Sequence, residues 1–381
     1  VAVQSFQKTP WRSQIPMNFL TLGAMALSLT GPTADEAQNQ GDWQGLDQEI
    51  QNLATSLQGE SGVNISGYTV IRWDYSGDVS PGGVPVGATD LSGFNVQNAR
   101  ISITGEVGDY GFKIQPDFAA TSISATSSLL RDAKVWWNFG DNFKLTVGQY
   151  KVPFSRRFLT SSNKKAFLDP NLYQIMYTAA GPPIAGAAPS LISIRDQGLM
   201  VGGAMDMFDW DISVSNGGDS TSEKYMIAGR VAVHVMGGGA PTYEGGYGLG
   251  DESAMTIGAA YMNDGSLAAG KSSWTLDALW AMNPFTVGAS VVGFGKGYTT
   301  DAMSQTSWDI YGTYMFTPNE WELALKYEMV DDFADTKAFT IGVNWYLYGP
   351  DSKWQLNYKN LTRSSGFADG GVIEAGLVLS F

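Results

Sequence analysis

The sequence predicts an all-β fold: a transmembrane antiparallel β-barrel of about sixteen strands with a short N-terminal helical segment. Three observations predict it. Apolar and polar residues alternate at period two through one segment after another, aromatic residues recur at the segment ends, and short connections alternate with long ones. Because successive strand side chains point to opposite faces, this alternation gives each strand one face for lipid and one for water.

The composition excludes several other classes of protein. Only 16% of the 381 residues are charged, yet the mean hydropathy is −0.10 and no run of about 20 apolar residues appears, as a membrane-spanning helix would need. The lack of cysteine excludes thiol chemistry, and a single histidine, His234, leaves little room for His-based catalysis or a multi-His metal site. The net charge of −14 argues against a nucleic-acid surface. We therefore expect no enzymatic activity, no cofactor, no metal and no nucleic-acid partner.

Residues 1–41 show no steady period, and we treat them as an N-terminal segment of unknown role. Within them, residues 19–29 (FLTLGAMALSL) follow Lys8 and Arg12 in the manner of a signal peptide. Since the sequence begins with Val1, we expect that a leader has already been removed and that this segment is retained. It is too short to span a bilayer as a helix.

Residues 42–59 form the predicted helical segment. Apolar residues recur there at spacings of three and four, with Asp42 as a plausible N-cap and Gly59 at the end. The apolar positions are Trp43, Leu46, Ile50, Leu53 and Leu57. Two interpretations stay open: a helix that packs on its own barrel, or a short coiled coil that joins protomers.

From about residue 60 to residue 381 the period-two alternation recurs in one segment after another, and this part forms the predicted barrel. Trp321, Leu323 and Leu325 alternate with more polar neighbours, and the last segment ends on the aromatic Phe381. Aromatic residues at segment ends are typical of strands that meet the two membrane interfaces. We expect strands near residues 63–75, 94–106, 110–120, 130–139, 143–151, 192–205, 209–216, 224–236, 254–263, 272–282, 284–296, 306–316, 320–331, 336–348, 352–361 and 371–381.

The connections provide an independent test, because outer-membrane barrels alternate short periplasmic turns with longer outer loops. Tight turns such as 108–110 and 317–319 fall at every second connection, and the intervening ones, such as 76–93, are longer. Residues 237–253 (GGGAPTYEGGYGLGDES) break the pattern, because they fall where a short turn is due.

Charged residues at the water-facing positions are the candidate pore lining. Such charges are costly unless they meet water or one another, so they imply a hydrated interior. Each one could instead cross-link neighbouring strands on the inner wall. The strand residues selected in this way are Arg72, Arg100, Lys113, Lys134, Lys144, Asp309 and Glu322. Most basic positions come from the first five strands and the later strands are mainly acidic, which predicts a transverse field across the pore.

The longest predicted loop, 152–191, follows the fifth strand. A loop of this length in a compact fold is usually functional. Folded into the barrel it would narrow the pore and offer cations to passing anions, whereas a solvated surface loop is the alternative. The basic residues in or beside it are Lys151, Arg156, Arg157, Lys164 and Lys165. Arg156 and Arg157 are adjacent, so we expect their side chains to diverge.

Residues 147–154 (VGQYKVPF), followed by 159–162 (LTSS), resemble the phosphate-selective porin family, as do 98–100 (NAR) and 195–198 (RDQG). The resemblance extends over about 61–381, and its specific motifs lie within 98–200. It implies a sixteen-stranded trimeric barrel for passive diffusion of ions and small hydrophilic solutes. It also implies an eyelet made by the third loop, and a place in the outer membrane of a Gram-negative bacterium, in contact with lipid and lipopolysaccharide. The net acidic chain shows no long run of lumen arginines, so its selectivity stays open.

Two other functions are alternatives to a porin. A structural barrel could anchor an N-terminal tether in the periplasm, and conduction in a planar bilayer distinguishes it from a channel. An outer-membrane enzyme needs a nucleophile and a base within reach of each other. With one histidine and no serine elbow, the sequence disfavours an enzyme.

Overall fold

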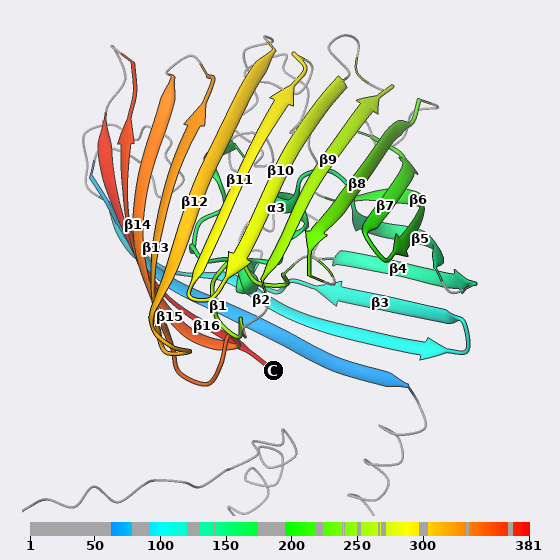
Figure 1. The fold of residues 1–381 in the computed structure, drawn as a ribbon, viewed down its shortest axis with the longest axis horizontal. Helices are drawn as coiled ribbons and strands as arrows, with labels where there is room; N and C mark the ends of the chain where they lie inside the picture. The colour runs from blue at the N-terminus through cyan, green and yellow to red at the C-terminus, as the bar shows by residue number, and fades with distance from the viewer. Residues whose placement is uncertain are drawn as a thin grey trace, which may run out of the picture. The chain divides into compact units, whose positions relative to one another are not determined.

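The computed structural model describes residues 62–77, 91–119, 130–140, 142–173, 195–217, 224–237, 239, 241–249, 253–265, 267, 272–296, 304–332, 335–364 and 369–381. Within these ranges, sixteen antiparallel strands form one closed barrel in which each strand pairs with its neighbours in the sequence (Figure 1). The prediction of a sixteen-stranded barrel is therefore confirmed. The predicted helix at 42–59 and the segment 1–41 lie outside the described residues.

The strand bounds agree with the predicted ones to within a few residues. The strands are β1 Val63–Ser76, β2 Leu91–Val107, β3 Tyr110–Pro116, β4 Leu130–Phe139, β5 Phe143–Lys151, β6 Arg195–Met205, β7 Phe208–Ser215, β8 Met226–Met236, β9 Ala254–Asp264, β10 Ser272–Met282, β11 Phe285–Phe294, β12 Gln305–Thr317, β13 Trp321–Val330, β14 Thr336–Tyr346, β15 Ser352–Thr362 and β16 Gly370–Ser380.

The barrel closes between the first and last strands. Gly67 and Phe381 exchange two backbone hydrogen bonds of 3.0 Å, and β1 pairs with β16 from Tyr68 opposite Ser380 to Ser76 opposite Val372. A Cβ on Gly67 would lie 2.7 Å from the Phe381 ring, so this close approach requires glycine. Closure leaves no unpaired strand edge in lipid.

The two faces of each strand differ as the alternation predicts. In β15, Trp354, Leu356 and Tyr358 are exposed on the outer face, whereas Lys353 and Gln355 are buried on the inner face. Outer-face aromatic rings touch one another near the rim where the short turns lie. The contacts include Tyr110–Trp137, Trp137–Phe139, Phe139–Phe143, Phe285–Tyr314, Phe316–Trp321 and Trp321–Trp345. This band is typical of a membrane interface.

Because the strands are antiparallel, alternate connections share a rim. We call the rim that holds the β2–β3, β6–β7 and β10–β11 turns the short-turn rim, since only two residues separate the strands there (108–109, 206–207 and 283–284). The β8–β9 connection, 237–253, belongs to the same rim and is much longer. The departure noted in the sequence is therefore a real elaboration of one turn.

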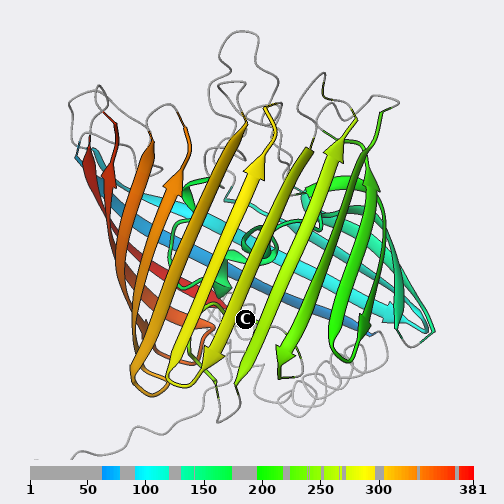
Figure 2. The ribbon, with the colours of Figure 1, turned by 45° about the horizontal axis from the view of Figure 1, so that its top comes forward.

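The described helices are short. They are the helix α3 Arg156–Leu159 and the 3-10 turn Ser162–Lys164, both in the segment after β5. In the part of the chain that the structure describes, no helix has the length and hydrophobicity to cross a membrane. Figure 2 shows α3 inside the ring of strands.

Candidate functional site

The segment after β5, residues 152–173, turns into the barrel and covers part of its inner wall. Apolar side chains of this segment, which we call the inner loop, are buried against inward-facing strand residues. One cluster joins the loop residues Val152, Phe154, Phe158, Leu172 and Tyr173 to Met226, Ala228, Ala260, Met262, Val292, Phe294, Val330, Ala338, Leu361 and Val372. The expectation that the inner face meets water therefore holds for only part of the wall, because this part is dry and packed.

Three ionic contacts fix the inner loop to the wall. In the first, Asp169 pairs with Arg72 of β1 and with Lys359 of β15. Arg72 also pairs with Asp74 at 2.8 Å, and Lys359 with Glu374 at 3.6 Å. All five side chains are buried, so each charge has an opposite charge within reach, as a buried ion requires.

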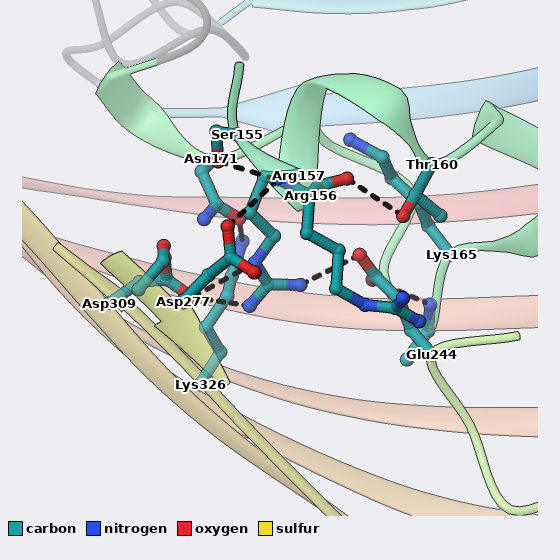
Figure 3. Close-up of polar contacts among 12 residues, drawn as sticks. Ser155, Arg156, Arg157, Thr160, Lys165, Asn171, Glu244, Asp277, Asp309 and Lys326 are labelled. Carbon is teal, nitrogen blue, oxygen red and sulfur yellow. Dashed lines mark hydrogen bonds and ion pairs between the residues drawn. The ribbon is translucent and has the colours of Figure 1, made fainter. Parts of the chain in front are cut away.

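The second contact centres on Arg157 of α3. Its guanidinium group donates to Asp309 of β12 from Nε at 3.1 Å and pairs with Glu244 of the β8–β9 connection at 2.8 Å (Figure 3). It also lies 4.0 Å from the centroid of the Tyr311 ring, a cation–π distance. Burial alone would raise the pKa of Glu244, but the neighbouring Arg157 and Lys165 lower it to about 2.

The third contact joins the start of the loop to β8 and β10. Arg230 and Asp277 form a two-pronged pair with both N···O distances at 2.7 Å. Arg230 also donates to the carbonyl oxygen of Phe154 at 2.7 Å, and Asp277 accepts from the Arg156 backbone N–H at 3.1 Å. This bidentate geometry fixes the orientation of the Arg230 guanidinium group and also neutralises its charge.

Ion pairs engage much of the acidic wall on which the predicted transverse field depends. Asp277 and Asp309 are neutralised by Arg230 and Arg157, and Glu328 by Lys326 at 2.9 Å. These three carboxylates are therefore not free to face the basic strands across the lumen.

Hollows line the inner faces of β3–β9, and the inner loop borders two of them. Three hollows of about 480, 370 and 310 Å³ follow one another there, and Asp211 of β7 borders all three. Leu159 and Ser161 of the loop border the two smaller ones. We call this space the passage.

The lining of the passage is basic although the chain is acidic. Among the described residues, eight cationic side chains and three carboxylates border the three hollows, and one of the cations, Arg230, is neutralised by Asp277. The cations are Lys113, Lys134, Lys144, Lys151, Arg156, Lys164, Arg195 and Arg230, and the carboxylates are Asp132, Asp209 and Asp211. A lining with this excess of positive charge raises the local concentration of anions.

Lysines of adjacent strands are central to this lining. Lys113 of β3 lies directly opposite Lys134 of β4, an arrangement that like charges disfavour. Asp132 offsets part of the repulsion between the two lysines, because its carboxylate lies 3.4 Å from the Lys113 ammonium group. The same carboxylate lies 2.6 Å from the Arg195 guanidinium group. Among the described residues, Lys134 makes no hydrogen bond and no ion pair within 4 Å, so its charge faces the passage uncompensated by direct contact.

Most of the predicted pore residues fall into two groups. Those that border the passage are Lys113, Lys134, Lys144, Lys151, Arg156 and Lys164. Those buried in the contact between the inner loop and the wall are Arg72, Arg157, Lys165 and Asp309, whereas Glu322 is buried beneath the β8–β9 connection, where it accepts from the Gly246 N–H. Arg100 belongs to neither group, because Asp117 binds it at 2.7 Å.

Arg156 and Arg157 diverge as their adjacency predicts. Arg156 borders a hollow and donates to the Pro241 carbonyl oxygen, whereas Arg157 is buried between two carboxylates. Their separate roles follow from the one-turn helix, which places successive side chains about 100° apart.

Sequence reasoning missed three residues that shape the site. Arg195 stood out only as part of a family-like stretch, although its position at the start of β6 makes it border the passage. Asp169 and Glu244 lie in connections, where strand parity gives no information on the direction of a side chain. The unusual length of 237–253 was the available signal for Glu244. Among the described residues, no group of three or more His, Asp or Glu side chains is placed to hold a metal ion.

Comparisons with known proteins agree with this architecture. The family model described as phosphate-selective porin O and P matches residues 67–366. A triple mutant of Rhodopseudomonas blastica porin is similar in structure, with a TM-score of 0.53 and 15% identity over 84% of this chain and 100% of that one. OmpT of Vibrio cholerae has a TM-score of 0.50 and 10% identity over 84% of this chain and 97% of that one. At these identities the structural likeness concerns the fold alone. A search of curated proteins gives no match.

Proposed function

The chain belongs to the phosphate-selective porin O and P family and forms a porin channel in the outer membrane of a Gram-negative bacterium, and from this premise we propose that it favours small anions. The observation that carries the proposal is the excess of cationic side chains along the passage, eight against three carboxylates. Small hydrated anions diffuse past them without a conformational cycle or a chemical step.

The inner loop is the proposed eyelet. Its residues Leu159 and Ser161 border the same hollow as Lys113 and Lys134, so the loop narrows the lumen at this level. Its other face is apolar or ion-paired to the wall, which supports a fixed constriction. Lys151 contributes to this rigidity, because it donates to the Leu159 carbonyl oxygen at 2.7 Å.

The finer assignments are part of the same proposal. We propose a homotrimer in contact with lipid and lipopolysaccharide, with no enzymatic activity of its own. Support comes from family membership and from the aromatic band and apolar outer face of the barrel.

Ion selectivity in a planar bilayer tests the function. Purified protein in a KCl gradient is expected to give a zero-current potential of the sign set by chloride. Replacing chloride with phosphate at constant ionic strength separates a general anion preference from a preference for phosphate. A cation-selective channel would refute the proposal, and a protein that inserts but does not conduct would favour the structural-anchor alternative.

A further inference from the structure

The β8–β9 connection is built differently from the other turns at the short-turn rim. It runs from 237 to 253, whereas two residues suffice for the β2–β3, β6–β7 and β10–β11 turns. A turn of that rim has no need of this length to reverse the chain. In its described central part, residues 241–249, Glu244, Gly245 and Gly246 are buried, and Glu244 contacts the inner loop.

Polar and aromatic contacts fix residues 241–249 to the wall. The Gly246 backbone N–H donates to Glu322 of β13 at 2.6 Å, and the Tyr247 ring lies 4.8 Å from that of Tyr346 in β14. A Cβ on Gly245 would lie 2.6 Å from the Glu322 carboxylate oxygens, so the Gly-Gly pair allows the chain to approach this closely. Tyr346 in turn donates to Glu322 at 2.7 Å.

Glu244 contacts the inner loop near Arg157 and again near Lys164 and Ala166. The Glu244 carboxylate pairs with Arg157 at 2.8 Å and accepts from the Ala166 N–H at 3.4 Å. The Glu244 backbone N–H donates to the Lys164 carbonyl oxygen at 3.0 Å. One buried residue therefore joins the start and the end of the segment that faces the passage (Figure 3).

Two cations of the passage also depend on this connection. The Arg156 guanidinium group donates to the Pro241 carbonyl oxygen. The Lys164 ammonium group lies 5.6 Å from the centroid of the Tyr243 ring, within cation–π range. Without these contacts both long side chains would sample many rotamers.

Building on the proposed function, we propose that residues 241–249 are an internal brace that holds the cations of the inner loop toward the passage, with Glu244 as its positioning residue. The brace sets both the rigidity of the constriction and the direction of Arg156 and Lys164. It therefore contributes to ion selectivity although Glu244 itself does not line the passage.

Because Glu244 carries a negative charge, electrostatics and positioning predict opposite changes in the anion preference when it is removed. The variant Glu244→Ala removes a negative charge, so electrostatics alone would strengthen the preference for anions. If the brace positions the cations, the same variant weakens the chloride-to-potassium permeability ratio and increases open-channel current noise. Glu244→Asp is expected to restore part of both properties. The control Glu320→Gln removes a charge from an exposed turn at the same rim and should change neither property.

A second variant covers the case in which Glu244→Ala fails to assemble. Tyr247→Leu removes the ring contact with Tyr346 without a change of charge, and it should also raise the current noise and lower the permeability ratio. The proposal that residues 241–249 position these cations would be refuted by assembled variants in which the current noise is unchanged and the anion preference is unchanged or stronger. A wild-type channel without anion preference would instead contradict the proposed function, so the two failures are distinguishable.

Discussion

At the scale of single residues, Lys134 combines a cost to stability with a place in the passage. It lies opposite Lys113 in the β3–β4 register and has no ion pair within 4 Å among the described residues. Like charges directly opposite in a sheet destabilise it. Under the proposed function, the charge of Lys134 acts on passing ions.

We therefore predict that Lys134→Gln lowers the chloride-to-potassium permeability ratio without a loss of stability. Because repulsion with Lys113 is removed, the free energy of unfolding should stay unchanged or rise by up to about 1 kcal/mol. Zero-current potentials in a KCl gradient and denaturant unfolding in detergent micelles measure the two effects. Lys337→Gln, at an exposed position of β14, is the matched control and should leave selectivity unchanged. A substantial loss of stability in Lys134→Gln would instead indicate a structural role.

Parity predicted which strand residues point inward. Lys113, Lys134 and Lys144 all border the passage, as the alternation indicates. Parity could not show which inward residues a loop would cover, because that depends on contacts between segments far apart in the sequence. Asp309 is an inward residue, yet it is bound to Arg157 beneath the inner loop.

At the scale of elements, the inner loop behaves as a separate unit docked on the wall. Its Asp169 carboxylate is shared between two cations from different strands, Arg72 and Lys359. Removing one partner from a buried ion cluster is more costly than losing a surface pair, because the remaining charges stay desolvated.

The variant Asp169→Asn is expected to loosen this docking. We predict a loss of about 3–5 kcal/mol in the free energy of unfolding, toward the lower end because Asp74 and Glu374 remain beside the two cations. The mean single-channel conductance should rise as the loop leaves the wall. Conductance in planar bilayers and unfolding in detergent measure both effects, with Asp206→Asn in the exposed β6–β7 turn as the control. Equal conductance in the two variants would show that Asp169 does not hold the eyelet in place.

The sixteen strands could be predicted from the sequence because each one carries its own period-two pattern and its own turn residues. The connections could not, because their residues obey no such period. The inner loop left a faint signal in β11, where Val291 and Val292 are apolar on both faces. A strand that is apolar on both sides must be covered on both sides, by lipid outside and by protein inside.

At the scale of the whole molecule, the net charge of the chain and the charge of its passage have opposite signs. The chain carries 37 acidic and 23 basic residues, whereas the passage has eight basic residues and three acidic ones. Many of the remaining carboxylates lie in buried ion pairs or on exposed turns. Selectivity follows the local potential, since charges farther away than a Debye length are screened.

Because the local charge of the passage determines the anion preference, this preference should depend on ionic strength. The Debye length falls from about 10 Å at 0.1 M salt to about 3 Å at 1 M. The anion preference should therefore weaken steadily as KCl is raised over this range at a constant concentration ratio. Zero-current potentials at each ionic strength measure it. A preference that stays constant across the series would mean that direct binding, and not the field of the lining, selects the ion.

The position of Asp169 also bears on the order of assembly. Its partners Arg72 and Lys359 belong to β1 and β15, and the neighbouring Glu374 to β16, so the cluster straddles the seam at which the barrel closes. The first and the last strands must already be side by side before Asp169 can meet both cations. Before the barrel closes, Asp169 therefore cannot bind Arg72 and Lys359 together. The inner loop completes its docking only in the closed barrel.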